Sequence, residues 1–157
     1  MFTVRPHIRE DIPLRVKWLN NQAANRFALE DPEHETTIQE QEEWFQKYEA
    51  DPRKKFFTFC VDDAPIGFMG LSKIADDRSD ANVFIYIGED TYRGKGYGKE
   101  ALGWLIRYAS DDLGLSALSL DVDRRNVSAC VLYQKMGFTV VRERDDEWEM
   151  RRALKTR

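Results

Sequence analysis

The sequence has few residues that could bind a metal or form a covalent cross-link. Its 157 residues include two cysteines and two histidines. Cys60 and Cys130 each lie inside an apolar segment and lack the spacing of a metal-binding pair. We therefore expect buried, reduced thiols rather than a disulfide or metal ligands. His7 and His34 are far apart in the chain, so we expect no metal site.

Long apolar runs and basic blocks are also missing. No apolar stretch approaches the ~18 residues that a membrane span requires. Residues 1–5 lack the apolar core of a signal peptide, so we expect a cytoplasmic protein that does not contact a membrane. The net charge is −4, and no block is rich in lysine or arginine, which argues against nucleic acid as the main partner. A chain of this length and ordinary composition predicts a single domain over residues 1–157.

The expected elements have the order of an α/β (α+β) protein. Apolar, β-branched and aromatic runs predict seven strands. These strands cover residues 2–5, 56–61, 66–71, 82–87, 117–122, 138–141 and 148–150. Apolar residues at helical spacing predict four helices. These helices follow Asp11, Thr37, the glycines near residue 96, and Asn126. Such an order implies a mixed sheet that is covered on both faces.

Local signals predict how the first two helices begin. Asp11 is expected to cap the first helix, and Ile12, Val16 and Leu19 are expected to form its buried face. Residues 37–40 (Thr-Ile-Gln-Glu) fit a capping box at the start of the second helix.

A glycine-rich stretch, Tyr92–Lys99, lies between a predicted buried strand and the central helix. Three glycines within five residues allow a backbone turn whose peptide N–H groups all point inward. The helix that begins there adds roughly half a positive charge at its N-terminus. The stretch therefore predicts a binding site for an anion, and a phosphate is the expected one.

Two common phosphate-binding patterns fit this stretch poorly. A nucleotide P-loop needs Ser or Thr after its Gly-Lys pair, and Glu100 stands there. The dinucleotide fingerprint needs a wider spacing before its last glycine. A flexible turn remains the alternative interpretation. The pattern Arg93-x-x-Gly96-x-Gly98 instead resembles the acyl-CoA pyrophosphate loop of the GNAT N-acyltransferase superfamily.

A second segment, residues 126–138, resembles the other signature of that superfamily. It matches at seven positions, namely Asn126, Ala129, Leu132, Tyr133, Lys135, Gly137 and Phe138. Both motifs occur in the expected order, about thirty residues apart. The order of elements resembles the GNAT fold over nearly the whole chain. The resemblance implies a mixed central sheet of about seven strands, splayed in the middle, with four helices.

The resemblance also implies a cosubstrate, acetyl-CoA, and a set of residues that bind it. These residues are Tyr86, Ile87, Arg93, Gly94, Lys95, Gly96, Tyr97, Gly98, Lys99, Asn126 and Lys135. Tyr133 would be the general acid that protonates the departing thiolate, although a tyrosine on an apolar helix face can equally be a core residue. Asn126 can cap its helix, contact the pantetheine arm, or do both. Lys135 is either a surface residue or a helper near the CoA phosphates.

The implied reaction is direct transfer of an acetyl group to a primary amine in a ternary complex. The acceptor is a peptide or protein N-terminus, or a small amine such as a polyamine, an aminoglycoside or an amino sugar. Glu30, Asp31 and Glu33 are candidate substrate residues, and eight acids between residues 30 and 49 would attract a cation. Solvated charges are the alternative interpretation.

Two further expectations concern assembly and turnover. The short final hairpin, residues 144–148, leaves the pocket wall either incomplete or supplied by a second subunit, so a homodimer is possible. The competing hypothesis for function is an acyl-CoA-binding sensor module without turnover.

Overall fold

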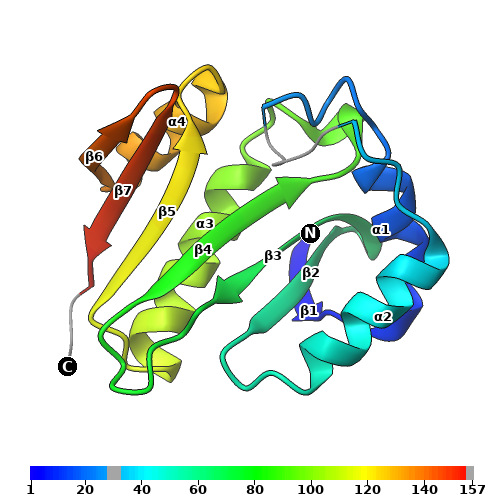
Figure 1. Cartoon of the computed structure of the whole chain (residues 1–157), viewed down its shortest axis with the longest axis horizontal. Coiled ribbons are helices and arrows are strands. Elements are labelled where there is room, and N and C mark those ends of the chain that lie inside the picture. The colour runs from blue at the N-terminus through cyan, green and yellow to red at the C-terminus, as the bar shows by residue number, and fades with distance from the viewer. Residues whose placement is uncertain (28–32, 155–157) are drawn as a thin grey trace.

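The chain folds around one seven-stranded mixed sheet, as the computed structural model shows for residues 1–27 and 33–154 (Figure 1). The strand order is β1-β2-β3-β4-β5-β7-β6. The strands are β1 (Phe2–Pro6), β2 (Lys55–Val61), β3 (Ala64–Ser72), β4 (Ala81–Ile87), β5 (Ala117–Asp123), β6 (Thr139–Arg144) and β7 (Glu147–Ala153). The helices are α1 (Ile12–Leu19), α2 (Ile38–Glu49), α3 (Tyr97–Arg107) and α4 (Val127–Lys135). The predicted order of elements and the predicted fold class are confirmed.

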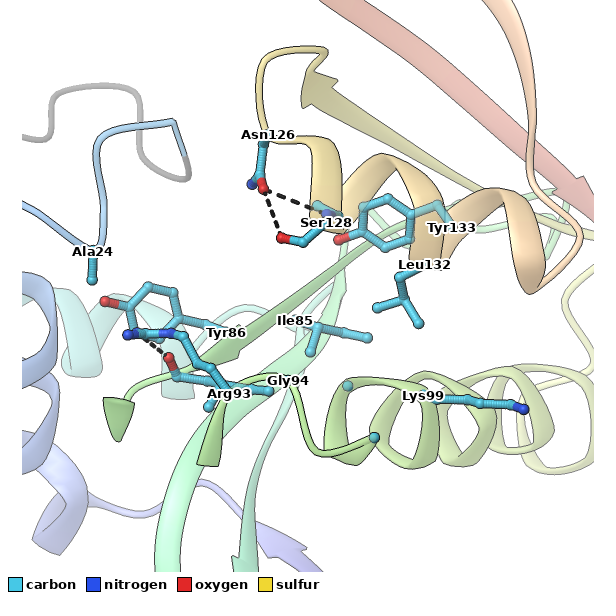
Figure 2. A pocket seen from close by; sticks show the side chains of 14 residues that line it. Ala24, Ile85, Tyr86, Arg93, Gly94, Lys99, Asn126, Ser128, Leu132 and Tyr133 are labelled. Carbon is cyan, nitrogen blue, oxygen red and sulfur yellow. Dashed lines mark hydrogen bonds between the residues drawn. The ribbon is translucent and has the colours of Figure 1, made fainter. Parts of the chain in front are cut away.

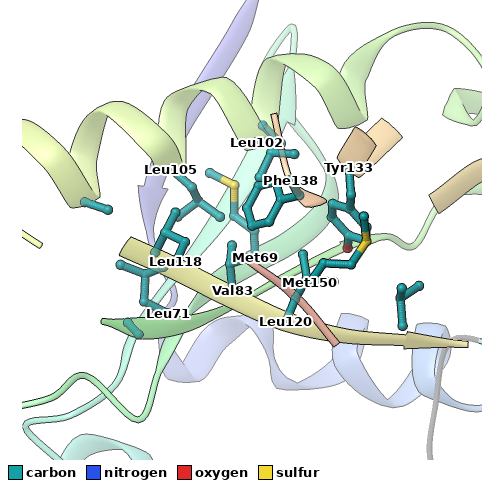
Figure 3. Packing of buried hydrophobic residues seen from close by; sticks show 14 of the residues in the cluster. Met69, Leu71, Val83, Leu102, Leu105, Leu118, Leu120, Tyr133, Phe138 and Met150 are labelled. Carbon is teal, nitrogen blue, oxygen red and sulfur yellow. The ribbon is translucent and has the colours of Figure 1, made fainter. Parts of the chain in front are cut away.

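The two faces of the sheet pack against different helices. On β3, Met69 and Leu71 belong to the main core, which also contains Leu102 and Leu105 of α3 (Figure 3). Phe68 points to the other face and packs with Trp18 of α1. Because side chains alternate along a strand, the nearly continuous apolar sequence of β3 supplies both layers.

The sheet parts between β4 and β5. These two strands are parallel, and they pair only at Ala81–Leu118 and Asn82–Ser119. On its other side, β4 remains paired with β3 as far as Ile87. The two strands therefore diverge after Asn82, and among the described residues β4 has no strand partner on that side for the rest of its length. This divergence is the splay that the sequence resemblance implies.

The predicted inner face of α1 is right at Ile12 but not at Val16 and Leu19, which are half-buried. Its buried residues are Ile12, Arg15 and Trp18, rather than Ile12 with Val16 and Leu19. The guanidinium of Arg15 stacks over the ring of Trp44 at 3.8 Å, so that a charged residue occupies an inward position. The sequence pattern counts apolar residues only and cannot detect an arginine that is buried by stacking between aromatic rings.

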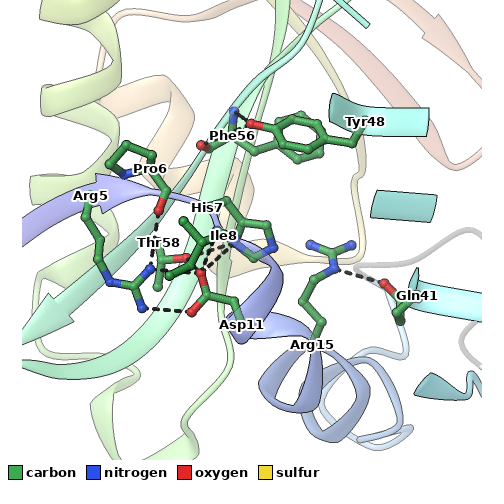
Figure 4. A network of polar contacts seen from close by, with 10 residues as sticks. All are labelled: Arg5, Pro6, His7, Ile8, Asp11, Arg15, Gln41, Tyr48, Phe56 and Thr58. Carbon is green, nitrogen blue, oxygen red and sulfur yellow. Dashed lines mark hydrogen bonds and ion pairs between the residues drawn. The ribbon is translucent and has the colours of Figure 1, made fainter. Parts of the chain in front are cut away.

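The predicted role of Asp11 is also wrong, because its side chain does not cap α1. The carboxylate instead accepts hydrogen bonds from Arg5, at 2.7 and 2.8 Å, and from the hydroxyl of Thr58 on β2, at 2.8 Å (Figure 4). Burial opposes ionisation, but the bonds from Arg5, the Ile8 N–H and Thr58 outweigh it and lower the pKa of Asp11. Asp11 thus ties the start of α1 to β1 and β2.

Other helix ends follow the sequence signals. The side chain of Thr37 accepts a hydrogen bond from the backbone of Glu40 and caps α2. The Glu40 side chain does not complete the capping box and instead contacts Thr36 and His34. Gly137 follows α4 with φ +93°, as expected for a residue that ends a helix in the left-handed region. Cys60 and Cys130 are free and buried, as predicted.

Two features of the fold were not predicted. The central helix continues as a π-helical turn, Tyr108–Asp112. The last two strands are longer than expected and are joined by the two-residue turn of Asp145 and Asp146.

Within residues 1–27 and 33–154, no helix is long and apolar enough to cross a membrane. The same part of the chain contains no cluster of three or more His, Cys, Asp or Glu residues suited to a metal ion.

Candidate functional site

A cleft of about 370 Å³ lies at the splay between β4 and β5 (Figure 2). The end of β4, the turn that follows it, the start of α3 and one side of α4 form its walls. Residue Ala24, in the segment after α1, closes the remaining side. The lining residues are Ala24, Ile85, Tyr86, Ile87, Arg93, Gly94, Gly96, Gly98, Lys99, Asn126, Ser128, Ala129, Leu132 and Tyr133.

The glycine-rich turn has the geometry that an anion-binding loop needs. Gly94 and Gly96 adopt φ values of +72° and +88°, which favour glycine. A Cβ atom at either position would meet nothing within 4 Å, so the backbone borders open space. Gly96 is also the N-cap of α3, so the N–H groups and the positive end of the helix dipole lie at this side of the cleft.

Arg93 lies at the edge of the cleft, but its guanidinium folds back. It donates hydrogen bonds to the carbonyl of Ile87 and to the carboxylate of Asp90. These contacts join the end of β4 to the turn before α3. Arg93 therefore fixes the shape of the turn, and its charge is balanced by that of Asp90.

The structure separates the eleven predicted cofactor residues into two groups. Eight of them line the cleft: Tyr86, Ile87, Arg93, Gly94, Gly96, Gly98, Lys99 and Asn126. Lys95, Tyr97 and Lys135 do not line it. The ring of Tyr97 instead packs on Phe2, with ring centroids 6.4 Å apart.

Five lining residues were not among the predicted site residues: Ala24, Ile85, Ser128, Ala129 and Leu132. Ala129 and Leu132 are positions of the second motif, so the motif itself signalled them. Ile85 lies two residues before Ile87 on β4, and strand alternation could have indicated it. No sequence signal marks Ala24, which reaches the cleft through the path of an irregular segment.

Tyr133 projects from α4 into the cleft (Figure 2). Its ring packs edge-on against Phe138 with centroids 5.8 Å apart, and only 8% of the residue is exposed. Its hydroxyl has no hydrogen-bond partner in residues 1–27 and 33–154. Burial, with a smaller effect from Cys130, raises the pKa of Tyr133 to about 12. The phenol therefore stays protonated and can donate a proton or a hydrogen bond to a group in the cleft.

Asn126 both caps α4 and lines the cleft. Its side-chain oxygen accepts hydrogen bonds from the Ala129 N–H and the Ser128 hydroxyl, each at 3.4 Å, and so caps α4. The same residue lines the cleft. The cap orients α4, and with it Tyr133, relative to the end of β5.

Tyr86 lines the cleft with its ring and anchors the segment after α1 with its hydroxyl. The hydroxyl contacts the Trp18 carbonyl at 2.7 Å and the side-chain oxygen of Asn25. Asn25 is fully buried and also donates to the Trp18 carbonyl, at 2.9 Å. These bonds hold residues 20–25 against β4, and they place Ala24 at the cleft.

The predicted substrate residues do not all fall within the described structure. Glu30 and Asp31 lie outside it. Glu33 lines a second hollow of about 280 Å³ with Gln22, Ala23 and Arg26, rather than the main cleft. Among the lining residues of the cleft that the structure describes, none is a carboxylate or a histidine. The described cleft thus offers an acid, Tyr133, but no general base.

A splayed mixed sheet, a glycine-rich anion turn at the splay and a protonated tyrosine in the gap define an acyl-CoA-dependent acyltransferase. The acetyltransferase (GNAT) domain family model matches residues 2–139, and the chain belongs to this family. It is an N-acetyltransferase that moves an acetyl group from its cosubstrate, acetyl-CoA, to an amine.

Individual relatives agree with the family. The chain is 30% identical to a spermidine N(1)-acetyltransferase of Escherichia coli over 137 residues, which are 87% of this chain and 72% of the relative. It is 25% identical to an α/β-tubulin N-acetyltransferase 9 of Drosophila melanogaster, over 87% of this chain and 74% of that one. A spermidine N-acetyltransferase of Vibrio cholerae, solved with CoA and spermine, has the same fold. The TM-score is 0.85 at 23% identity, with 97% of this chain and 95% of that one covered.

Proposed function

We propose that the acceptor is a small aliphatic polyamine of the spermidine type. The observation that carries this proposal is the 30% identity to a bacterial spermidine N(1)-acetyltransferase across 87% of the chain. The acid-rich stretch from residue 33 to 49 supports it. Several of these acids already have cationic partners, since Glu42 and Glu49 pair with Arg9. Glu33, Glu35 and Glu43 remain exposed to attract a polycation.

The residues of the cleft divide the work of acetyl transfer. The N–H groups of the turn around Gly94 and Gly96, with Lys99 beside them, hold the CoA diphosphate. A backbone N–H near Ile87, on the unpaired side of β4, stabilises the negative charge that develops on the thioester oxygen. Tyr133 donates its proton to the thiolate that leaves. Positioning of the two reactants together can account for roughly 7–11 kcal/mol of the barrier.

The amine must lose its proton before it attacks. For an alkylamine with a pKa near ~10.4, the neutral form at pH 7 costs about 4–5 kcal/mol. Since no carboxylate or histidine lines the described part of the cleft, we propose that solvent accepts this proton before attack. Turnover of a polyamine should then rise steeply with pH.

A protein or peptide N-terminus is the second candidate acceptor. The Drosophila relative that bears the name of a tubulin N-acetyltransferase supports it. An α-amine with a pKa near ~7.8 costs only about 1 kcal/mol to deprotonate at pH 7. A cleft whose described lining includes no carboxylate or histidine suits such an amine.

An amine panel separates these candidates. Thiol release from acetyl-CoA is measured with spermidine, a peptide that has a free N-terminus, an aminoglycoside and an amino sugar. The highest kcat/KM with spermidine supports the proposal, and the highest value with the peptide supports the second candidate. Tight CoA binding with no turnover on any amine would instead favour a sensor module.

We also propose that residues 1–157 form one domain that pairs as a homodimer. The strands near both ends of the chain, β1 and β7, belong to the same sheet, which supports a single domain. Among the described residues, those of β6, β7 and their two-residue turn do not line the cleft, so the last hairpin builds no wall there, which supports a wall from a second copy. Light scattering of the pure protein tests the pairing, and a mass of one chain at all concentrations would refute it.

A further inference from the structure

Two segments that are far apart in the sequence meet near the cleft. The guanidinium of Arg125, in the turn between β5 and α4, lies over the ring of Phe27 at 4.7 Å. Phe27 belongs to the segment after α1. Neighbours of both residues, Ala24 and Asn126, line the cleft from opposite sides (Figure 2). The contact between Arg125 and Phe27 therefore joins two of the segments that border the cleft.

Arg125 is held there by more than the ring. It donates hydrogen bonds to both carboxylate oxygens of Asp123, at 3.0 and 2.7 Å. Its guanidinium also lies 3.7 Å from the carboxylate of Asp146. The Arg26 guanidinium also lies over the Phe27 ring, at 5.1 Å. One aromatic face and two carboxylates thus surround the Arg125 guanidinium. This is the chemistry that binds an alkylammonium group from solution.

The surroundings of Arg125 are not buried, so the cation can leave. Its side chain is 54% exposed, and that of Asp146 is 59% exposed. Exposed ion pairs and cation–π contacts are each worth ~1 kcal/mol or less. A ligand that carries its own ammonium can therefore compete for the same ring and carboxylates at little energetic cost.

We propose that Arg125 is a gate residue. Its guanidinium occupies the site between Phe27 and Asp123 in the free protein, and the second ammonium of a polyamine occupies the same site when the polyamine binds. This inference rests on the proposed polyamine acceptor. The attacking amine enters the cleft, and a distal ammonium displaces Arg125 from Phe27 and Asp123. Acceptors with one charge do not need this exchange and are indifferent to the gate.

The neighbouring residue Arg124 provides a matched control. It carries the same charge and is exposed, and within the described chain it acts on Asp123 through its charge without a side-chain hydrogen bond or close ion pair. We compare Arg125→Ala and Arg124→Ala with the unaltered protein at saturating acetyl-CoA. The acceptors are spermidine and a singly charged alkylamine such as hexylamine.

We expect Arg125→Ala to lower the KM for spermidine by about three- to five-fold, because the carboxylates and the ring become free. The KM for hexylamine, the kcat values and the KM for acetyl-CoA should stay unchanged, and Arg124→Ala should have little effect. Adding Asp123→Asn to Arg125→Ala should restore the KM for spermidine toward that of the unaltered protein. High salt should reduce the difference in this KM between Arg125→Ala and the unaltered protein.

Several outcomes overturn the gate. An unchanged or raised KM for spermidine in Arg125→Ala would refute it. A raised KM for acetyl-CoA would make Arg125 a ligand of the cosubstrate instead. An equal decrease of the KM for spermidine in Arg124→Ala would show that the effect comes from the loss of any positive charge in this region rather than from Arg125 itself. If the unaltered protein acetylates no polyamine, the proposed acceptor and the gate both fail; if it acetylates spermidine but the variants show no selective change, only the gate fails.

Discussion

The indole ring of Trp18 lies directly on the backbone of Gly88. A Cβ atom at position 88 would be 2.0 Å from Cδ2 of the ring. The indole N–H donates a hydrogen bond to Glu89 at 3.1 Å, and the ring also stacks on Phe68. These contacts press α1 against the end of β4, where the sheet parts. Their geometry therefore fixes α1, and the segment after it that carries Ala24, relative to the end of β4.

We predict that Gly88→Ala lowers the free energy of unfolding by about 2–3 kcal/mol, because the buried ring has to move. The displaced α1 should also raise the KM for the amine acceptor, while CoA binding should change little. Urea denaturation and steady-state kinetics measure the two effects. The control is Gly103→Ala on α3, where a Cβ atom would lie 3.4 Å from the flexible tip of Arg107. Alanine there should be neutral or stabilising by up to ~1 kcal/mol. Equal stability of the two variants would contradict the prediction.

The sequence predicted the framework of this site because its framework is local. A buried strand, a glycine turn and a capped helix each depend on neighbours within a few residues. Tyr133 and Asn126 were found because residues 126–138 carry a specific motif. The splay was expected from the resemblance to the GNAT fold, and the place of the glycine turn at the carboxyl end of a central strand indicated where a ligand would bind.

The acceptor side could not be predicted in the same way, because distant segments form it. Ala24 reaches the cleft only because Asn25 is held by Trp18 and Tyr86. The buried arginine at position 15 depends on Trp44, which lies 29 positions further along the chain. Hydrophobic periodicity contains no information about such pairings. Asp11 illustrates the same limit, since its partners Arg5 and Thr58 lie on two other elements.

The glycine turn allows a sharp test of the anion cradle. We predict that Gly96→Glu lowers CoA affinity by more than ~100-fold, because it places a negative charge and a side chain in the space meant for a diphosphate. Isothermal titration with CoA measures the loss. Gly114→Glu is the matched control, since Gly114 also has a positive φ (+65°) and a Cβ atom there would meet nothing within 4 Å. Both variants carry the same kind of backbone strain and the same charge, so equal CoA affinity in the two would refute the cradle.

Tyr133 allows a test of the acid. We predict that Tyr133→Phe lowers kcat by ~10²-fold or more with CoA affinity little changed, since a general acid acts only on the departing thiolate. Tyr108→Phe, which removes a hydroxyl from the π-helical turn of Tyr108–Asp112, should have nearly normal turnover. Unchanged kcat in Tyr133→Phe would exclude the acid role.

The pH dependence of turnover follows from the same residue. Burial raises the pKa of Tyr133 to about 12, so its acid form persists across the accessible alkaline range. With the amine as the group that must lose a proton, kcat/KM should rise with pH and should not fall before pH ~10. A profile recorded from about pH 6 to about pH 10.5 measures this. A decrease with a midpoint below about pH 9 would contradict the raised pKa.

The last prediction concerns a buried histidine and the pH dependence of the stability of the fold. His7 is 5% exposed, and its Nδ1 lies 2.8 Å from the hydroxyl of Thr58 (Figure 4). That hydroxyl gives its single proton to Asp11, so it accepts from His7, which is then the neutral Nδ1–H form. Burial, reinforced by the charge of Arg15, lowers the pKa of His7 from 6.5 to about 4.

Because the folded-state pKa is below the unfolded value, the unfolded chain binds the proton more readily. The stabilisation is therefore fully present above pH 6.5 and is lost progressively as the pH falls toward 4. We expect His7 to account for a decrease of about 3 kcal/mol in the free energy of unfolding across this window. Urea denaturation at several pH values between about 7 and 4 should show the slope. His7→Asn keeps a donor near Thr58 and should flatten the pH dependence of the free energy of unfolding. Replacement of the exposed His34 by Asn should leave that pH dependence unchanged. An equal slope in His7→Asn and the unaltered protein would show that other groups cause the loss.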